Sequence, residues 1–470
     1  MLNLLMYFYQ VVIQEDEKMK KALSVLLTMG LTVSMLAGCG SNGAADNASA
    51  GNAADNSAAD NTVAATESSA AAGEAKSASD IKVGVIYIGD ENEGYTAAHM
   101  AGIDQMMSNL GLSEDQVVEK TLIPEDESAY DAAVDLADQG CNIIFGTSFG
   151  HESYLLQAAA EYPEVQFCHA TGYQAASSGL SNMHNYFDSI YEARYVSGVV
   201  AGLKLNQMIE DGTITEDSCK MGYVGAFPYA EVISGFTSFY LGAKSQCPSA
   251  TMEVQYTNSW ADMSGEAEVA AKLIDDGCVL ISQHADTTGA PTACEAKKVP
   301  CVGYNIDMIP TAPDAALTSA TINWGPYYTY AVQSVIDGTA IETDWAKGVK
   351  DGADAITELN DKTVAEGTKE AVEEAQRCLG CKNAKCIAGC PVSINIPAFI
   401  QEVKAGNIDT SKFTVGGKTL EELVESGDKD ATKLKDYIKD GYFHESDVES
   451  GMPSAPAFTF IIDGINSITK

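Results

Sequence analysis

The feature that most constrains the fold is a regular alternation of short apolar runs and longer amphipathic stretches, which begins near residue 81. Residues 81–88 are almost continuously apolar and rich in β-branched side chains, which is typical of a strand buried on both faces of a parallel sheet. Similar runs recur at residues 141–146, 165–170, 221–226, 252–257, 278–282 and 301–304. The repeated runs predict parallel strands.

The stretches between these runs carry apolar residues at helical spacing, as at residues 129–138, 155–161, 230–244 and 266–275. Strands that alternate with helices predict a parallel sheet covered by helices. The chain holds more such units than one small sheet accommodates, and the long helical stretch at residues 189–206 is interpreted as a crossover between two lobes. We therefore expect an α/β fold of two lobes, each with its own parallel sheet.

The N-terminal region predicts export. Two lysines precede an apolar run at residues 22–36, which is too short to span a bilayer comfortably and is typical of a signal peptide. The run closes in Leu-Ala-Gly-Cys39, which resembles a bacterial lipobox and implies cleavage before Cys39 and diacylglyceryl attachment to its thiol. An ordinary signal peptide with a chance cysteine is the alternative. Residues 1–18 place acidic side chains where a signal favours positive charge, so Met19 is expected to be the true start.

Differences in composition along the sequence divide the chain into regions. Residues 1–38 are interpreted as an N-terminal extension and lipoprotein signal peptide. Residues 39–79 carry almost no large apolar side chain, cannot support a core, and predict a disordered tether. Residues 80–376 and 409–470 are interpreted as one ligand-binding domain, and residues 377–408 as a cysteine-rich insert.

The charge balance limits the partners. Acidic residues outnumber basic ones by 66 to 28, which gives a formal net charge of -38. Such a surface repels nucleic acid phosphates and anionic lipid headgroups, so no nucleic acid partner is expected. A ligand in the cleft should be neutral or cationic.

Polar and aromatic side chains gather where the predicted strands end. In open α/β sheets the ligand binds beyond the carboxyl ends of the strands. Flat rings to stack on, with amides or carboxylates to read an edge, suit a planar hydrogen-bonding ligand such as a nucleobase. Singly, each aromatic could be core and each Asp or Asn a helix cap. The candidates are Asp90, Asn92, Tyr95, Phe149, Glu152, Trp260, Asp286, Asn305, Asp307 and Trp324.

The chain lacks the common catalytic motifs. It has no P-loop, no G-x-G-x-x-G after the first strand, no G-x-S-x-G elbow and no H-E-x-x-H. The six histidines show no metal-binding spacing. The sequence therefore predicts a binding protein and no catalytic residue.

At these same positions the chain resembles the basic membrane protein family of substrate-binding lipoproteins, which are receptors of ABC importers for purine nucleosides and related compounds. The resemblance implies a type I periplasmic-binding-protein fold of two α/β lobes, joined by three crossovers and closing on ligand at a hinge. It covers about residues 81–360 and 409–470. The matching stretches include VGVIYIGDENEGYTAAHMAG, IIFGTSFG, EARYVSGVVAGL, MGYVGAFPYAEVISGF, NSWADMSGEAEVAAKLIDDG, GYNIDM and NWGPYY.

By position in that family, Tyr95 resembles the stacking aromatic of the first lobe and Trp260 its partner in the second. The resemblance also implies base-reading groups at Asp90, Asn92 and Glu152, and groups near a ribose at Asp286, Asn305 and Asp307. The nucleoside-specific branch places a lysine near residues 322–323, and this chain has none there. A free nucleobase or another small ring therefore stays open beside a nucleoside.

Four of the twelve cysteines form a separate motif. Cys378, Cys381, Cys386 and Cys390 have the spacing C-x2-C-x4-C-x3-C-P, in which close thiolates can hold an iron–sulfur cluster. The segment resembles the N-terminal iron–sulfur domain of glutamate synthase small subunits, in which the last cysteine of such a run serves a second cluster. No cysteine follows Cys390 to complete a second set. A [4Fe-4S] cluster, a pair of disulfides and a fusion scar that binds nothing all remain open.

Together these observations predict a lipid-anchored receptor at the outer face of a bacterial cell membrane. It would bind a purine nucleoside or nucleobase, need no cofactor for binding, act as a monomer and deliver its ligand to an ABC permease. The alternatives are an iron–sulfur redox or redox-sensing protein on a receptor scaffold, and a surface sensor without transport.

Overall fold

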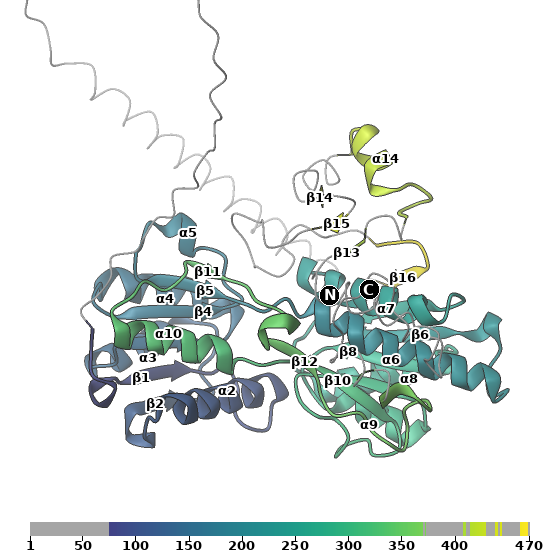
Figure 1. Ribbon diagram of the computed structural model, residues 1–470, viewed down its shortest axis with the longest axis horizontal. Coiled ribbons are helices and arrows are strands. Elements are labelled where there is room, and N and C mark those ends of the chain that lie inside the picture. The colour runs from purple at the N-terminus through teal and green to yellow at the C-terminus, as the bar shows by residue number, and fades with distance from the viewer. Residues whose placement is uncertain are drawn as a thin grey trace, which may run out of the picture. The chain divides into compact units, whose positions relative to one another are not determined.

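The computed structural model describes residues 75–369, residue 372 and short segments at 408–409, 414–428, 438–439, 442–443 and 461–468. All of these belong to one compact unit, Glu67–Lys470. The predicted signal peptide, most of the tether, Cys39 and the four cysteines at 378–390 lie outside the described residues. Figure 1 shows the arrangement of the helices and strands.

The first lobe is built on a six-stranded sheet whose paired strands all run parallel. Continuous apolar runs form its centre, and every residue of β1 and β3 is buried. The spatial order is β11 (Asp344–Trp345), β5 (Met183–Tyr186), β4 (Gln166–Ala170), β3 (Ile143–Gly146), β1 (Val83–Ile86) and β2 (Val117–Lys120).

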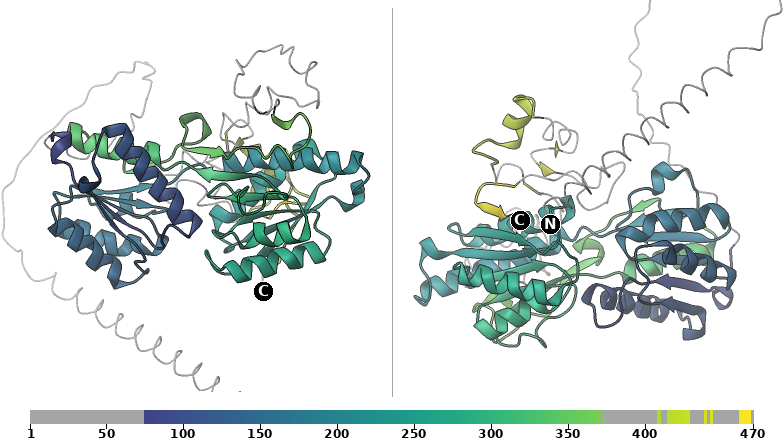
Figure 2. Two further views of the ribbon diagram at one scale, coloured as in Figure 1. Left: turned by 90° about the horizontal axis from the view of Figure 1, so that it is seen from below. Right: turned by 180° about the vertical axis from the view of Figure 1, so that it is seen from behind.

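Helices cover both faces of this sheet, as Figures 1 and 2 show. On one face, α2 (Gly94–Leu110) and α10 (Gly325–Asp337) share a core with the strands. On the other, α3 (Glu127–Asp138) and α4 (Glu152–Glu161) form a second core, which also contacts the short α5 (Ala175–Ser178). The amphipathic stretch predicted at 155–161 is thus the later part of α4.

The second lobe has a seven-stranded sheet, in which β12 alone of the described strands runs antiparallel to its neighbour. The spatial order is β12 (Asp354–Ile356), β10 (Ala316–Ile322), β9 (Cys301–Tyr304), β8 (Leu280–His284), β6 (Lys220–Gly225), β7 (Thr251–Tyr256) and β16 (Ile465–Ile468). One face packs against α6 (Tyr191–Glu210) and α7 (Ala230–Gln246), and the other against α8 (Met263–Asp275) and α9 (Gly289–Lys297).

Three crossovers join the two sheets. The chain passes from β5 to the second lobe before α6, returns after β10 to form α10, and crosses again between β11 and β12. The predicted two-lobed α/β fold, with its three crossovers, is confirmed. The predicted crossover at 189–206 is correct in place, but the chain crosses just before the helix, and α6 itself packs in the second lobe.

Helices α6 and α7 approach each other unusually closely. A Cβ atom added to Gly198 of α6 would lie 2.1 Å from the carbonyl oxygen of Phe239 in α7. A Cβ added to Gly242 of α7 would lie 2.2 Å from the carbonyl oxygen of Tyr195 in α6. Real Cβ atoms do not approach backbone oxygens so closely, so only glycine fits at these two positions.

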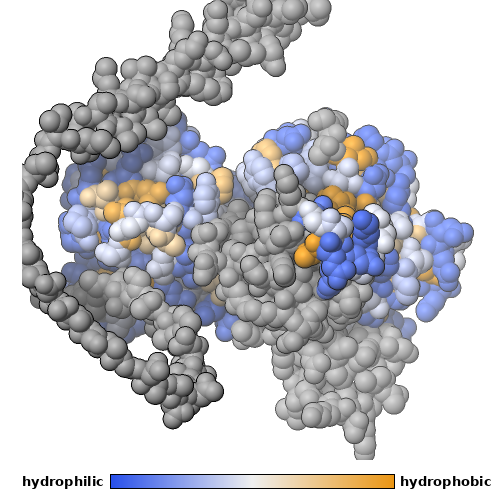
Figure 3. Space-filling view, turned by 90° about the horizontal axis from the view of Figure 1, so that it is seen from above, coloured by the Kyte–Doolittle hydropathy of each residue, from blue (hydrophilic) through white to orange (hydrophobic). Residues whose placement is uncertain are grey.

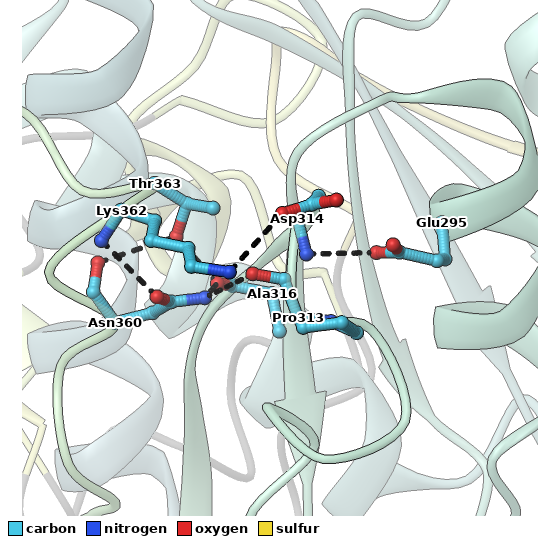
Figure 4. Close-up of polar contacts among 7 residues, drawn as sticks. All are labelled: Glu295, Pro313, Asp314, Ala316, Asn360, Lys362 and Thr363. Carbon is cyan, nitrogen blue, oxygen red and sulfur yellow. Dashed lines mark hydrogen bonds and ion pairs between the residues drawn. The ribbon is translucent and has the colours of Figure 1, made fainter.

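Residues 357–369 follow β12 and are held against the loop between β9 and β10 (Figure 4). The side-chain amide of Asn360 donates to the carbonyl oxygens of Pro313 and Ala316, at 3.0 and 2.8 Å. The hydroxyl of Thr363 donates to the same oxygen of Ala316 at 2.5 Å. The segment that precedes the cysteine-rich motif is therefore anchored to the second lobe.

The chain returns to the same lobe at its far end. Strand β16 pairs in parallel with β7 at the sheet edge opposite β12. Just before it, the carboxylate of Asp463 accepts hydrogen bonds from the backbone N–H groups of Gly416 and Gly417, at 3.0 and 2.9 Å. The other described elements of this region are α14 (Leu420–Glu425) and a small sheet of β13 (Ile408–Asp409), β15 (Tyr442–Phe443) and β14 (Ile438–Lys439).

On the face drawn in Figure 3, the described surface is a mosaic of hydrophilic residues and smaller hydrophobic patches. Among the described residues, the large hydrophobic side chains that remain exposed are Leu122, Phe149, Tyr173, Tyr229 and Met263. None of the described helices is long and apolar enough to cross a bilayer.

Candidate functional site

A cavity of about 250 Å³ lies where residues of both lobes meet. Its lining is dominated by aromatic rings and carboxyl groups, and it includes no lysine, arginine or histidine. The rings belong to Tyr95, Phe149, Phe187, Tyr229, Trp260 and Tyr304, and the carboxyl groups to Glu93, Glu125, Glu231 and Asp286. Ile88, Gly89, Ser148, Thr171 and Ala261 complete the lining.

The topology explains why these side chains meet. In each lobe the lining residues lie at or just beyond the carboxyl ends of the strands, where an open parallel sheet binds its ligand. In the first lobe Ser148 follows β3 and Phe187 follows β5. In the second lobe Trp260 follows β7, Asp286 follows β8 and Tyr304 ends β9. The site therefore follows from the strand order rather than from one continuous motif.

Tyr95 forms part of the first-lobe wall, and its ring is fixed from two sides. Its hydroxyl donates to the carbonyl oxygen of Thr147 at 2.6 Å. Its ring meets the rings of His99 and Trp324 edge-on, with centroids 4.5 and 5.9 Å apart. Burial raises the pKa of Tyr95 well above its usual range, so the hydroxyl stays protonated. Tyr95 is thus a rigid, neutral ring at the cavity wall.

Glu93 begins α2 and at the same time faces the cavity. Its carboxylate accepts the backbone N–H groups of Tyr95 at 2.7 Å and Thr96 at 2.8 Å, as an N-cap does. Burial raises the pKa of Glu93. The hydrogen bonds from Tyr95 and Thr96 oppose this rise without cancelling it. Glu93 is thus both the N-cap of α2 and part of the cavity wall.

A stacked pair of rings lies at the rim of the first lobe. Phe149 stacks on Tyr173 with centroids 6.0 Å apart, and both rings are more than two-fifths exposed. Beneath them the carboxylate of Glu125 accepts the Ser148 hydroxyl at 2.6 Å and the Gly150 N–H at 2.8 Å. The rim is therefore apolar but supported by a hydrogen-bonded carboxylate.

The second-lobe wall is a cluster of three rings around Trp260. Phe227 stacks on Tyr229 with centroids 5.0 Å apart, and Trp260 packs against them at 5.4 and 6.2 Å. The backbone carbonyl oxygen of Trp260 accepts the backbone N–H of Asp286 at 2.8 Å, which joins the two loops that carry these residues.

Asp286 places a carboxyl group of the second lobe near Glu93 of the first. Its carboxylate accepts the side-chain amide of Asn305 at 2.8 Å. Burial raises the pKa of Asp286 well above its usual range, and the charge of Glu93 raises it further. A ligand that presents N–H donors or positive charge here would relieve this repulsion, whereas a phosphate would add to it.

Of the ten predicted ligand residues, Tyr95, Phe149, Trp260 and Asp286 line the cavity. The structure places the other six elsewhere, in supporting contacts or in the core. The Asp90 carboxylate accepts hydrogen bonds from the backbone N–H and the side-chain amide of Asn92 at 3.0 and 3.1 Å, within the turn at residues 90–93.

The remaining four are accounted for in the same way. Glu152 is buried and accepts the N–H groups at residues 173–174, so it shapes the loop that carries Tyr173. Asn305 supports Asp286, and exposed Asp307 accepts the N–H two residues later. Trp324 is buried in the core, stacked on His99 with centroids 3.9 Å apart.

Sequence reasoning missed six of the lining residues with rings or carboxyl groups. Glu93 has the sequence position of a helix cap, which does not by itself indicate a ligand residue. Glu231 lies in the first turn of α7, where acidic residues are common in any protein. Tyr304 belongs to an apolar strand run. The others are Glu125, Phe187 and Tyr229.

No metal site accompanies this cavity in the part of the chain that the structure describes, where no three His, Cys, Asp or Glu side chains converge in a way that could hold an ion. The seven cysteines described are buried and unpaired. The four cysteines of the predicted cluster lie beyond this part.

Two family models match the chain. Residues 81–379 match the Bmp family, described as PnrA-like ABC transporter substrate-binding proteins. Residues 355–420 match a second family, described as dihydropyrimidine dehydrogenase domain II with a 4Fe-4S cluster.

The chain is also 36% identical over 284 residues to a purine-binding protein of Brucella abortus, which covers 60% of this chain and 76% of that protein. It is 34% identical over 217 residues to a putative ABC transporter glucose-binding protein of Haloferax volcanii, covering 46% and 52% of the two chains.

Among solved structures, a solute-binding protein of an ABC transporter from Conexibacter woesei superposes with a TM-score of 0.51 at 21% identity, covering 63% of this chain and 95% of that one. At this identity the likeness concerns the fold alone, and the fold is the one predicted. Since the family match spans more than half of the sequence, the chain belongs to the Bmp family of PnrA-like ABC transporter substrate-binding proteins.

Proposed function

We propose that this protein is the extracytoplasmic receptor of an ABC importer and binds a purine base or nucleoside between its two lobes. The observation that carries the proposal is the cavity itself, with rings from both lobes, four carboxyl groups and no cationic side chain in its lining. Flat rings favour a planar ligand, and acceptor groups favour one rich in N–H donors. The named function of the Brucella relative supports the same ligand class.

Two further observations bear on the identity of the ligand. The missing lysine near residues 322–323 favours a free base over a nucleoside. The Haloferax relative is named for glucose, so a sugar is the competing ligand. Six aromatic rings in the lining argue for a heteroaromatic ring system instead.

The remaining parts of the proposal rest on the sequence and the family. The lipobox-like Cys39 would anchor the protein at the outer face of the cell membrane, with residues 39–79 as its tether. The receptor would act as a monomer, close by a hinge motion at the crossovers and deliver its ligand to a membrane permease.

Purines should raise the melting temperature of the protein in a thermal-shift screen of bases, nucleosides, glucose and amino acids. A ligand at a hundred times its Kd stabilises the folded state by about 2.7 kcal/mol. A rise in melting temperature with purine bases or purine nucleosides, and with no other compound of the screen, supports the proposal. A response to glucose alone, or to no purine on cooperatively melting protein, contradicts it.

Within the same screen, Trp260→Ala should remove most of the purine response, because base–aromatic stacking contributes about 1–3 kcal/mol. Met263→Ala is the matched control, since Met263 is a large exposed side chain outside the cavity lining. An undiminished shift in Trp260→Ala would mean that the ring does not contact the ligand.

A second candidate function concerns residues 378–390. The match of residues 355–420 to a 4Fe-4S domain favours an iron–sulfur group held by Cys378, Cys381, Cys386 and Cys390. In the domain that this segment resembles, the last cysteine serves a second cluster, so Cys390 would have to complete the set of Cys378, Cys381 and Cys386 through a different closure of the loop. Such a cluster would supply one-electron transfer.

Protein prepared without oxygen should then contain close to four iron and four sulfide per chain and absorb near 400 nm. Cys381→Ala should abolish both. Colourless protein without iron, prepared in parallel with a known iron–sulfur protein that retains its cluster, would eliminate this candidate.

A further inference from the structure

Glu231 differs from the other carboxyl groups of the cavity in how it is held. It lies in the first turn of α7, faces the cavity and is only 4% exposed. Its Oε1 lies 2.5 Å from Nε2 of His284, the last residue of β8. The carboxylate is therefore fixed from behind while it faces the ligand space.

The hydrogen-bond chain behind Glu231 has one consistent direction. Burial lowers the pKa of His284, and the charge of Arg194 lowers it further, so the imidazole is neutral and carries a single N–H. The Glu231 carboxylate oxygen lies close to Nε2 and can only accept, so we place the single imidazole proton on Nε2. Nδ1 then has a free lone pair for the Tyr223 hydroxyl, which lies 3.3 Å away and whose pKa burial raises.

A buried cation lies under the same wall. Arg194 is fully buried, and its guanidinium carbon lies 3.8 Å from the ring centroid of Tyr304, which lines the cavity. Its Nη1 donates to the carbonyl oxygen of Gln283 at 2.5 Å, while Nε and Nη2 have no hydrogen-bond partner. Arg194 and Glu231 shift the pKa of both Tyr304 and His284 in opposite directions, so both charges lie near these two rings.

The close packing around His284 keeps this arrangement rigid. A Cβ atom added to Gly235 of α7 would lie 2.7 Å from His284 Nδ1. Glycine at 235 therefore lets α7 approach the imidazole closely enough for Glu231, one turn earlier, to reach Nε2. The acceptor that faces the cavity is preorganised before ligand arrives.

We propose that Glu231 is a specificity-determining residue that selects amino-substituted purines over their oxo counterparts. The inference rests on the proposed purine-binding function and deepens it. An exocyclic amino group donates a hydrogen bond to the free carboxylate oxygen. A carbonyl group at the same ring position would place one acceptor against another with no proton between them, which leaves a buried polar group unsatisfied.

The test is calorimetric binding of two matched ligand pairs to the purified full chain. Adenine and hypoxanthine exchange an amino for an oxo group at ring position 6, and guanine and xanthine do so at position 2. Wild-type protein should bind the amino member at least tenfold more tightly in the pair whose exchanged group meets Glu231. The corresponding nucleosides replace the bases if only nucleosides bind.

Glu231→Gln should reduce that ratio at least fivefold, because the amide can donate to a carbonyl group while its oxygen still accepts from His284. Glu210→Gln removes the same charge at the exposed end of α6 and should leave the ratio unchanged.

Two results overturn the inference: less than tenfold preference in both pairs, or an unchanged ratio in folded Glu231→Gln. The wild-type ratio alone tests it if the variant fails to fold. Absence of any purine binding by wild-type protein would instead overturn the proposed function.

Discussion

Replacing Gly198 by alanine is expected to lower the free energy of unfolding by about 3 kcal/mol, although alanine normally favours a helix over glycine. The added Cβ would lie 2.1 Å from the carbonyl oxygen of Phe239, which is backbone and cannot rotate away. Helix α6 would have to move off α7, and overpacking of this kind costs about 1–3 kcal/mol or more. The effect should therefore lie at the upper end of this range.

Urea unfolding followed by circular dichroism measures this change. Glu210→Ala, at the exposed end of the same helix, is the control and should change the free energy of unfolding by less than about 0.5 kcal/mol. If Gly198→Ala proves as stable as wild type, the two helices do not approach each other as closely as described.

The second large effect concerns the free energy of unfolding and its dependence on pH. The part of this dependence that is due to Glu266 should disappear in Glu266→Gln. Glu266 is buried at the start of α8, and burial raises its pKa from 4.5 to about 7. Between these values the folded chain holds a proton that the unfolded chain releases. The contribution to stability is thus complete below pH 4.5 and is lost as the pH rises through about 7. The shift corresponds to about 3 kcal/mol.

The comparison of wild type with Glu266→Gln isolates this group from the many other carboxyl groups. A glutamine oxygen can still accept the N–H groups of Asp262 and Thr287, which Glu266 Oε1 accepts at 3.3 Å. The two proteins should unfold at similar urea concentrations near pH 4.5, and the variant should be the more stable one above pH 7. A difference that stays constant with pH would show that Glu266 is ionised in the folded protein.

Glu266 also connects stability with binding. The N–H that it accepts belongs to Thr287, directly after the cavity residue Asp286. The loop that presents Asp286 is therefore held by a carboxyl group whose pKa is raised to about 7.

The sequence allowed the central strands to be predicted because burial on both faces demands a continuous apolar run. Strands β3, β4, β6 and β8 appear where such runs were identified. A strand at the edge of a sheet need not be buried on both faces, so its sequence need not be a continuous apolar run. Strand β2 is half-buried with the sequence VVEK, and β11 is two residues long, so neither leaves a clear apolar signal.

The candidate site was predicted less completely, for a different reason. The position of a residue after a strand predicts nearness to the cavity edge but not the direction of its side chain. Trp260 and Trp324 both follow strands of the second lobe, yet one lines the cavity and the other lies in a core with His99. Only the packing of α2 against α10, which is set by tertiary contacts, distinguishes the two.

The last strand of the second lobe has a consequence for biogenesis. Strand β12 ends at Ile356 and β16 begins only at Ile465, so β7 is left as an open sheet edge until the distal segment of the chain reaches it. Unpaired edges invite pairing with other chains, so a chain that has not yet added β16 is exposed to aggregation. The entropy of closing a loop grows only logarithmically with its length, so a long intervening segment adds little to the thermodynamic cost of completing the sheet. A module inserted between these strands would therefore lengthen the time for which β7 stays unpaired while adding little to the free-energy cost of completing the sheet.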